Sequence, residues 1–130
     1  MIGFPKVQKD DLQYSILRKD TKLTGDLFFS GRLHVFGSIT GNIISTEDAD
    51  STLVLEQGSE INGEIRAGNI LVHTLISGDI FAYKRLSLKA TAIIQGDVHY
   101  QELEMEQGAT INGNLSALNK EKPNGFVDDS

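Results

Sequence analysis

Hydrophobic and polar residues alternate along most of the chain, and a four-residue pattern of polar residue, glycine, polar residue and aliphatic residue interrupts the alternation. Alternation at a period of two is typical of β-strands. Between consecutive glycines of the pattern lie steps of 16, 22, 15, 18 and 17 residues, which leave no room for a helix between strands. The pattern occurs six times, at residues 24–27, 40–43, 62–65, 77–80, 95–98 and 112–115.

Three columns of large apolar residues accompany these glycines, two positions after, two positions before and eight positions before each of them. Strands that recur about every 17 residues can pair in parallel only if the chain coils, so the columns predict a β-solenoid. The columns are Leu27, Ile43, Ile65, Ile80, Val98 and Leu115; Leu23, Ile39, Ile61, Ile76, Ile94 and Ile111; and Leu17, Leu33, Leu55, Ile70, Leu88 and Met105.

The predicted fold is all-β: a single-stranded parallel β-helix of about six turns over residues 16–118. We expect a flexible tail at 1–15 and a disordered tail at 119–130. Each glycine is expected at a corner between strands, where φ is positive or no room is left for a Cβ atom. Spacings within each copy are constant, so insertions are predicted only between one copy and the next. The longest such interval contains residues 45–52, which predict a solvated loop.

Composition narrows the function classes. The chain has 130 residues, no cysteine and a net charge of −6, which excludes disulfides and thiolate metal sites and argues against nucleic-acid binding. No apolar run approaches the length of a signal sequence or a membrane span, so a cytoplasmic protein is predicted. Asp48 and Asp50 lack the glycine-rich calcium-binding repeat of other β-helices, and no metal site is predicted.

No catalytic constellation emerges from the histidines. His34, His73 and His99 occupy different positions relative to the glycine of their own copy, so they are not expected to converge, and neither an enzyme activity nor a cofactor is predicted. The alternative of another class is a left-handed hexapeptide-repeat acyltransferase. Its columns repeat every six residues, whereas here the spacings are six and then four.

The residue after each glycine forms a polar column of its own, with three carboxylates on consecutive turns. Like charges that close repel each other, and the predicted role is a solvated corner. The sequence does not determine whether the polar residues before each glycine face inward or outward. The column after the glycines consists of Asp26, Asn42, Glu64, Asp79, Asp97 and Asn114.

An eleven-residue element also recurs: "LEQGSEINGEI" at 55–65 returns as "MEQGATINGNL" at 105–115, with six identities. With its repeated Gly-[Asp/Glu/Asn]-aliphatic corners and short dissimilar tails, the chain resembles the bactofilins over residues 17 to 118. The resemblance implies a right-handed β-helix that polymerises end to end into nonpolar filaments without nucleotide. It also implies a scaffold for cell-wall or morphogenesis proteins beneath the inner membrane. Many relatives carry Phe where this chain has Ile111.

Self-assembly is also expected from the residues themselves. A solenoid leaves unpaired backbone groups and an open slice of core at each end, and the short charged flanks of this chain make poor caps. The predicted interface is end to end and polymeric; a discrete adaptor capped by its own tails is the alternative. The interface residues are Leu17, Leu23 and Leu27 at one end and Met105, Ile111 and Leu115 at the other.

The N-terminal tail carries a candidate membrane hook. Ile2 and Phe4 lie beside Lys6, and this small apolar segment next to positive charge resembles the membrane-targeting tails of some bactofilins. One hook binds weakly, but a filament would display many of them at high effective concentration. A tail without membrane affinity remains the other interpretation, because acidic Asp10 and Asp11 follow.

Overall fold

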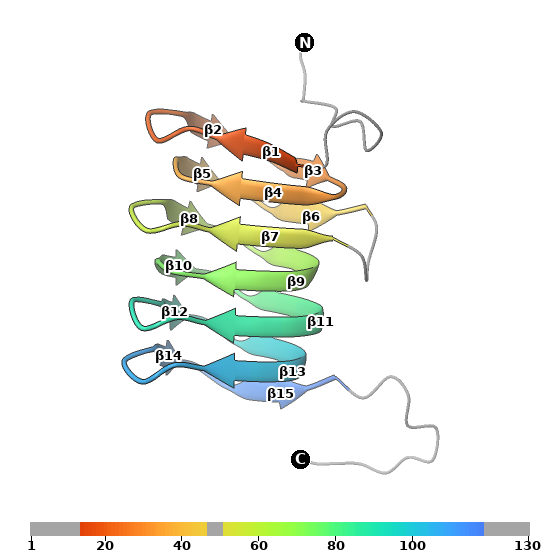
Figure 1. The fold of residues 1–130 in the computed structure, drawn as a ribbon, viewed down its shortest axis with the longest axis vertical. Helices are drawn as coiled ribbons and strands as arrows, with labels where there is room; N and C mark the ends of the chain where they lie inside the picture. The colour runs from red at the N-terminus through yellow and green to blue at the C-terminus, as the bar shows by residue number, and fades with distance from the viewer. Residues whose placement is uncertain (1–13, 47–50, 119–130) are drawn as a thin grey trace.

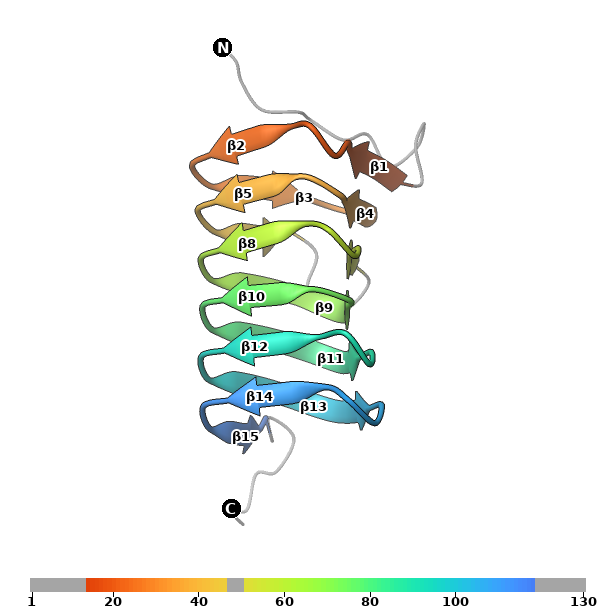
Figure 2. The ribbon, with the colours of Figure 1, turned by 90° about the vertical axis from the view of Figure 1, so that its left-hand side faces the viewer.

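The computed structural model describes residues 14–46 and 51–118, and every regular element in them is a strand. The strands wind into a right-handed parallel β-helix (Figures 1 and 2). In Figure 1 the front strands run to the left, and the chain returns behind them to the right as it descends. The predicted fold class is therefore confirmed, and the left-handed coil of a hexapeptide-repeat enzyme is not formed.

Each turn has three faces, which we call face A, face B and face C. Face A contains β1 (Tyr14–Leu17), β4 (Arg32–Val35), β7 (Thr52–Leu55) and the C-terminal halves of β9 (Ile65–Val72), β11 (Ile80–Leu88) and β13 (Val98–Met105). Face B contains β2 (Lys22–Thr24), β5 (Ser38–Thr40), β8 (Glu60–Asn62), β10 (Leu75–Ser77), β12 (Ile93–Gln95) and β14 (Thr110–Asn112). Face C contains β3 (Leu27–Phe29), β6 (Ile43–Ser45), the N-terminal halves of β9, β11 and β13, and β15 (Leu115–Ala117).

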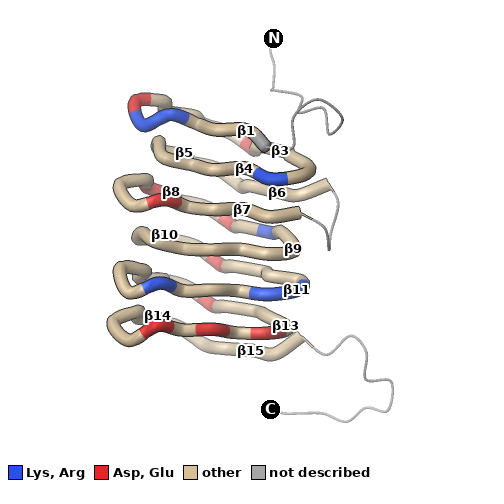
Figure 3. The backbone as a smooth tube through the Cα atoms, in the orientation of Figure 1, with Lys and Arg blue, Asp and Glu red and all other residues tan. Residues whose placement is uncertain are grey.

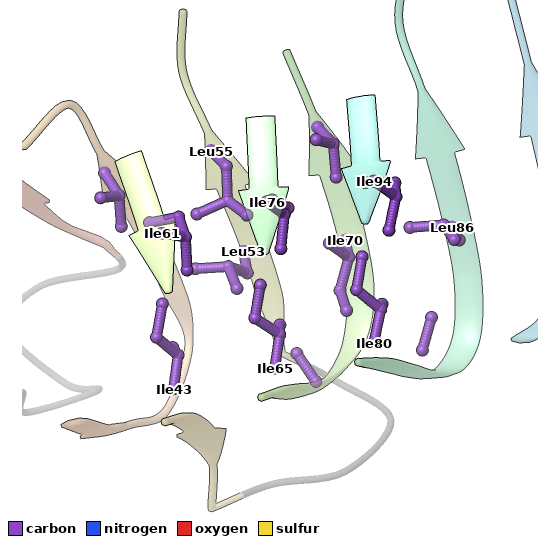
Figure 4. Packing of buried hydrophobic residues seen from close by; sticks show 14 of the residues in the cluster. Ile43, Leu53, Leu55, Ile61, Ile65, Ile70, Ile76, Ile80, Leu86 and Ile94 are labelled. Carbon is purple, nitrogen blue, oxygen red and sulfur yellow. The ribbon is translucent and has the colours of Figure 1, made fainter. Parts of the chain in front are cut away.

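Strands of one face pair in parallel with those of the turns before and after. Face B is a six-stranded sheet with one strand from each of turns one to six, while faces A and C share a nine-stranded sheet. Inward side chains of the three faces meet on the axis of the coil (Figure 4). Ile39, Ile61, Ile76 and Ile94, which stack in register on face B, are at most 1% exposed. Each such side chain contributes about 1.5–3 kcal/mol by its burial.

The corner between faces A and B corrects one detail of the predicted columns. It contains four residues in turns one, three, five and six, but only two in turns two and four. Val35 and Val72, rather than Leu33 and Ile70, therefore stack in register with Leu55. A difference of two residues keeps the same side of the strand facing inward, so Leu33 and Ile70 are also buried, and alternation alone cannot distinguish the two registers.

The repeated eleven-residue element corresponds to a four-residue corner followed by a face B strand and a glycine corner. In turns three and six the backbone N–H of Ser59 or Ala109 donates to the carbonyl three residues earlier, which closes a β-turn. The third residue of these turns is Gly58 or Gly108, with φ of 96° and 109°. Glycine adopts this conformation without steric cost, which explains why "EQG" occurs at both places.

Candidate assembly interface

The C-terminal end of the solenoid exposes a slice of its core. β14 and β15 are the last strands of their sheets, each with a neighbour on one side only. Met105 is 43% exposed and Leu115 is 48% exposed, and Ile111 between them is half-buried. One turn earlier, Leu88 lies in register with Met105 and is 1% exposed. Val98 lies in register with Leu115 and is 0% exposed. An apolar surface that continues the core therefore ends in solvent at this turn.

The N-terminal end is less open. Leu17 and Leu23 lie on the end strands β1 and β2 and are half-buried, whereas Leu27 on β3 is 3% exposed. Leu27 therefore belongs to the closed core of the first turn and offers little surface to a partner. The sequence columns did not single out Ile16 and Phe28, which point outward in the first turn and are 51% and 48% exposed.

From turn two to turn six, the glycine at the corner between faces B and C is required by the turn before it. An added Cβ at Gly63 would lie 1.8 Å from the carbonyl oxygen of Gly41, and one at Gly78 would lie 2.0 Å from that of Gly63. Both glycines also have φ near 150°. Gly25, in the first turn, has nothing within 4 Å of such a Cβ. The stacking of turns therefore forces glycine at this corner, as predicted.

The polar column after these glycines is a hydrogen-bonded ladder rather than a row of tolerated charges. A side-chain oxygen in one turn accepts the backbone N–H of the residue at the same position in the next turn. The corner is solvent-accessible, as expected, but Asp26, Asn42, Asp79 and Asp97 also have a role that the sequence did not predict, because each accepts a bond from a backbone donor. The donors and acceptors are Asn42 N–H to Asp26 at 3.2 Å, Glu64 N–H to Asn42 at 3.0 Å, Asp97 N–H to Asp79 at 3.0 Å and Asn114 N–H to Asp97 at 3.1 Å.

On the outer surface of face C, Arg66 belongs to a column of stacked side chains that the sequence did not predict. Its guanidinium carbon lies 4.3 Å from the centroid of the Phe81 ring, and that ring stacks on His99 at 4.4 Å. Arg66 also donates to the Tyr83 hydroxyl at 3.1 Å and forms an ion pair with Glu64. The bond to Tyr83, supported by Glu64, raises the pKa of Arg66 above its usual value.

The histidines lie on different parts of the coil. His34, on outer face A, is 3.0 Å from the Glu56 carboxylate, while His99 is on face C and His73 is at the corner between faces A and B. Among residues 14–46 and 51–118, no group of three or more His, Cys, Asp or Glu side chains could hold a metal ion. No helix in this part of the chain could cross a membrane.

The sequence left open which way the polar residues before the glycines point. They face outward, since Thr24, Thr40, Asn62, Gln95 and Asn112 are exposed and Ser77 is half-buried. The candidate membrane hook, Ile2, Phe4 and Lys6, lies outside the described residues, and so do Asp48 and Asp50.

The model of the bactofilin family, described as polymer-forming cytoskeletal, matches residues 15–116. The chain belongs to the bactofilin family. No curated protein and no solved structure matches it. The matched bactofilin region begins within β1 and ends within β15, so it includes all six turns of the coil and both of its end slices.

Proposed function

We propose that this bactofilin is a non-catalytic structural protein that polymerises end to end, without nucleotide, into nonpolar filaments. The filaments would lie at the cytoplasmic face of the inner membrane and recruit cell-wall or morphogenesis proteins. One observation carries the proposal: the apolar core runs unbroken to Met105 and Leu115 and ends there half-exposed. A second copy supplies the surface that would cover this slice.

The energetics of such a joint follow from the end turns. Covering the exposed parts of Met105 and Leu115 contributes about 1 kcal/mol for each side chain on each copy. Closing Ile111 and pairing the backbone of β14 and β15 with the partner add to this by strand addition. These contributions exist in the polypeptide itself, which is why no nucleotide is needed. In a nonpolar filament, C-terminal ends meet each other and N-terminal ends meet each other. The N-terminal slice, in which Leu17 and Leu23 are half-buried, supports the second of these joints.

Membrane attachment is proposed for the N-terminal tail. Phe4 and Ile2 together would contribute only a few kcal/mol on insertion, which is marginal for one subunit. Because a filament carries one tail for each subunit, attachment of one tail raises the effective concentration of the others. Filaments would then stay bound to a membrane from which single subunits dissociate.

Electron microscopy of the purified protein without nucleotide tests the polymer. Six turns at about 4.8 Å predict a filament one domain thick with a repeat of roughly 30 Å, or twice that if subunits alternate in direction. Ile111→Arg, which places a charge in the C-terminal slice, should reduce filaments to short oligomers. Thr110→Arg is the matched control, because Thr110 is exposed on the outer side of the same strand. Wild-type protein that sediments as single subunits at high concentration would refute the proposal.

A further inference from the structure

The outer surface of face A carries charges in a definite order along the coil. From turn two to turn six, the first column of face A contains Arg32, Thr52, Asn69, Arg85 and Glu102 in register, and the third contains His34, Val54, Leu71, Ser87 and Glu104. At the corner, directly after the strands, follow Glu56, His73, Lys89 and Glu106 in turns three to six. Figure 3 shows the basic residue on β4, the basic residues on β11 and the run of acidic residues on β13.

Turns at equal distances on either side of turn four carry charges of opposite sign on this face. Turn two is basic through Arg32 and turn six is acidic, while turn three is acidic through Glu56 and turn five is basic. Turn four itself presents Asn69 and Leu71, which are uncharged and half-buried. A surface with this order is complementary to a copy of itself turned end for end, which is the requirement for a two-fold interface.

We propose that face A docks on face A of a second copy, antiparallel along the coil, with a two-fold axis that runs along the strand direction past Leu71. Rotation about the strand direction keeps each residue at its position along the strand. Arg32 of one copy then faces Glu102 of the other, and Glu56 faces Lys89. Leu71 faces Leu71. The inference rests on the proposed filaments and assigns the face by which two of them pair.

The charges also select one register. If the copies slide by one turn, turn two faces turn five, and Arg32 meets Arg85 instead of Glu102. Like charges that face each other are destabilising, so this register is disfavoured. Within each subunit Arg85 already lies 3.6 Å from Glu102 and Lys89 lies 3.4 Å from Glu106. Docking extends these pairs into a network across the interface, where each single pair contributes little.

The area explains why this contact needs filaments. A four-residue strand is about 13 Å long and five turns span about 24 Å, so face A offers roughly 300 Å². Stable interfaces between single proteins bury about 800 Å² on each partner. One pair of subunits is therefore too small to persist, whereas filaments repeat the contact along their length. A nonpolar filament contains subunits in both directions, so antiparallel copies are always present on its neighbour.

A cysteine cross-link tests the axis, because the chain contains no cysteine of its own. Packed sheets lie about 10 Å apart, and a bismaleimide of matching span would join residues that face each other. In filaments of the full-length protein whose only substitution is Leu71→Cys, we expect most subunits to become covalent dimers. Thr52→Cys is the matched control, since Thr52 is equally half-buried but lies one turn from the axis. Ile44→Cys, also half-buried, reports the outer surface of face C.

Each outcome has one meaning. Dimers from Leu71→Cys alone, with a yield that falls severalfold between about 0.1 M and 1 M salt while filaments persist, support the proposal, because screening weakens exposed charge pairs. Paired filaments that cross-link through Ile44→Cys or Thr52→Cys instead, or not at all, overturn it and leave the filament proposal intact. Leu71→Cys dimers in a protein that forms no filaments would overturn both the proposed polymer and the requirement that filaments repeat the contact, while the assignment of face A would stand.

Discussion

Replacing the corner glycine of turn four with alanine isolates the contribution of turn stacking to stability. The Cβ of Gly78→Ala would lie 2.0 Å from the carbonyl oxygen of Gly63, where ordinary contacts need more than 3 Å. The two turns would have to separate by about 1 Å at this corner. Gly25→Ala introduces the same side chain at a glycine with φ of 116° and nothing within 4 Å. The pair therefore separates steric clash from backbone strain.

The magnitude follows from what the clash disrupts. Both variants incur backbone strain of about 1–3 kcal/mol, because alanine disfavours positive φ. In Gly78→Ala the separation of turns also weakens the bond from the Gly63 N–H to the Ser77 carbonyl, 3.0 Å long, and the packing of the core beneath it. At about 1 kcal/mol for each hydrogen bond plus lost packing, we expect Gly78→Ala to lower the free energy of unfolding by roughly 3–5 kcal/mol more than Gly25→Ala.

Urea denaturation followed by far-ultraviolet circular dichroism measures this difference, at protein concentrations where sedimentation finds single subunits. Since natural domains have a total stability of about 5–15 kcal/mol, Gly78→Ala should be partly unfolded or close to it. Equal midpoints for the two variants would show that the corner selects glycine for its φ alone. The reasoning from close approach of the turns would then be refuted.

Three further perturbations probe the core, the ladder and the tail. Ile94→Ala, at a fully buried site, should lower the free energy of unfolding measured in urea by about 2–5 kcal/mol. Ile93→Ala, at a residue that is 39% exposed, should lower it by less than about 1 kcal/mol. Similar losses for the two variants would contradict the assignment of Ile94 to the inward side of the strand. Asp79→Ala removes the acceptor for the Asp97 N–H and should lower the free energy of unfolding by about 1 kcal/mol, and Asp79→Asn should restore most of it because the amide keeps an acceptor oxygen; no difference between the two would argue against the ladder. Deletion of residues 2–6 should reduce co-sedimentation of filaments with liposomes, and unchanged co-sedimentation would remove the membrane hook.

The sequence predicted the coil because two local requirements repeat in it. Alternation placed residues such as Ile61 and Ile76 inward, and the glycine corners marked each turn. The column assigned to Leu33 and Ile70 was wrong because two additional residues at a corner leave the alternation unchanged. Corner lengths depend on turn geometry, which the pattern of hydrophobic positions does not encode.

The stacked column and the ladder lie at constant distances from the glycine of each copy, so the sequence contained their register but not their contacts. Arg66, Phe81 and His99 stack because they occupy the same position on consecutive turns, although they are 15 and 18 residues apart in the chain. The role of Asp79 as an acceptor requires the Asp97 N–H to point at it across a turn, which follows from backbone geometry rather than from residue type. The exposure of Met105 and Leu115 was predictable because the last copy of the repeat is followed by no further copy that would cover it.

The two lengths of the corner between faces A and B have a practical consequence for engineering. In turns two and four this corner contains two residues, whereas in the other turns it contains four. The core is buried in both cases, so the length of the corner is independent of the packing inside the coil. Affinity tags or short recognition peptides inserted between Glu56 and Ser59 would leave the interior untouched. In a polymer they would be displayed once for each subunit, at regular intervals of about 30 Å along the filament.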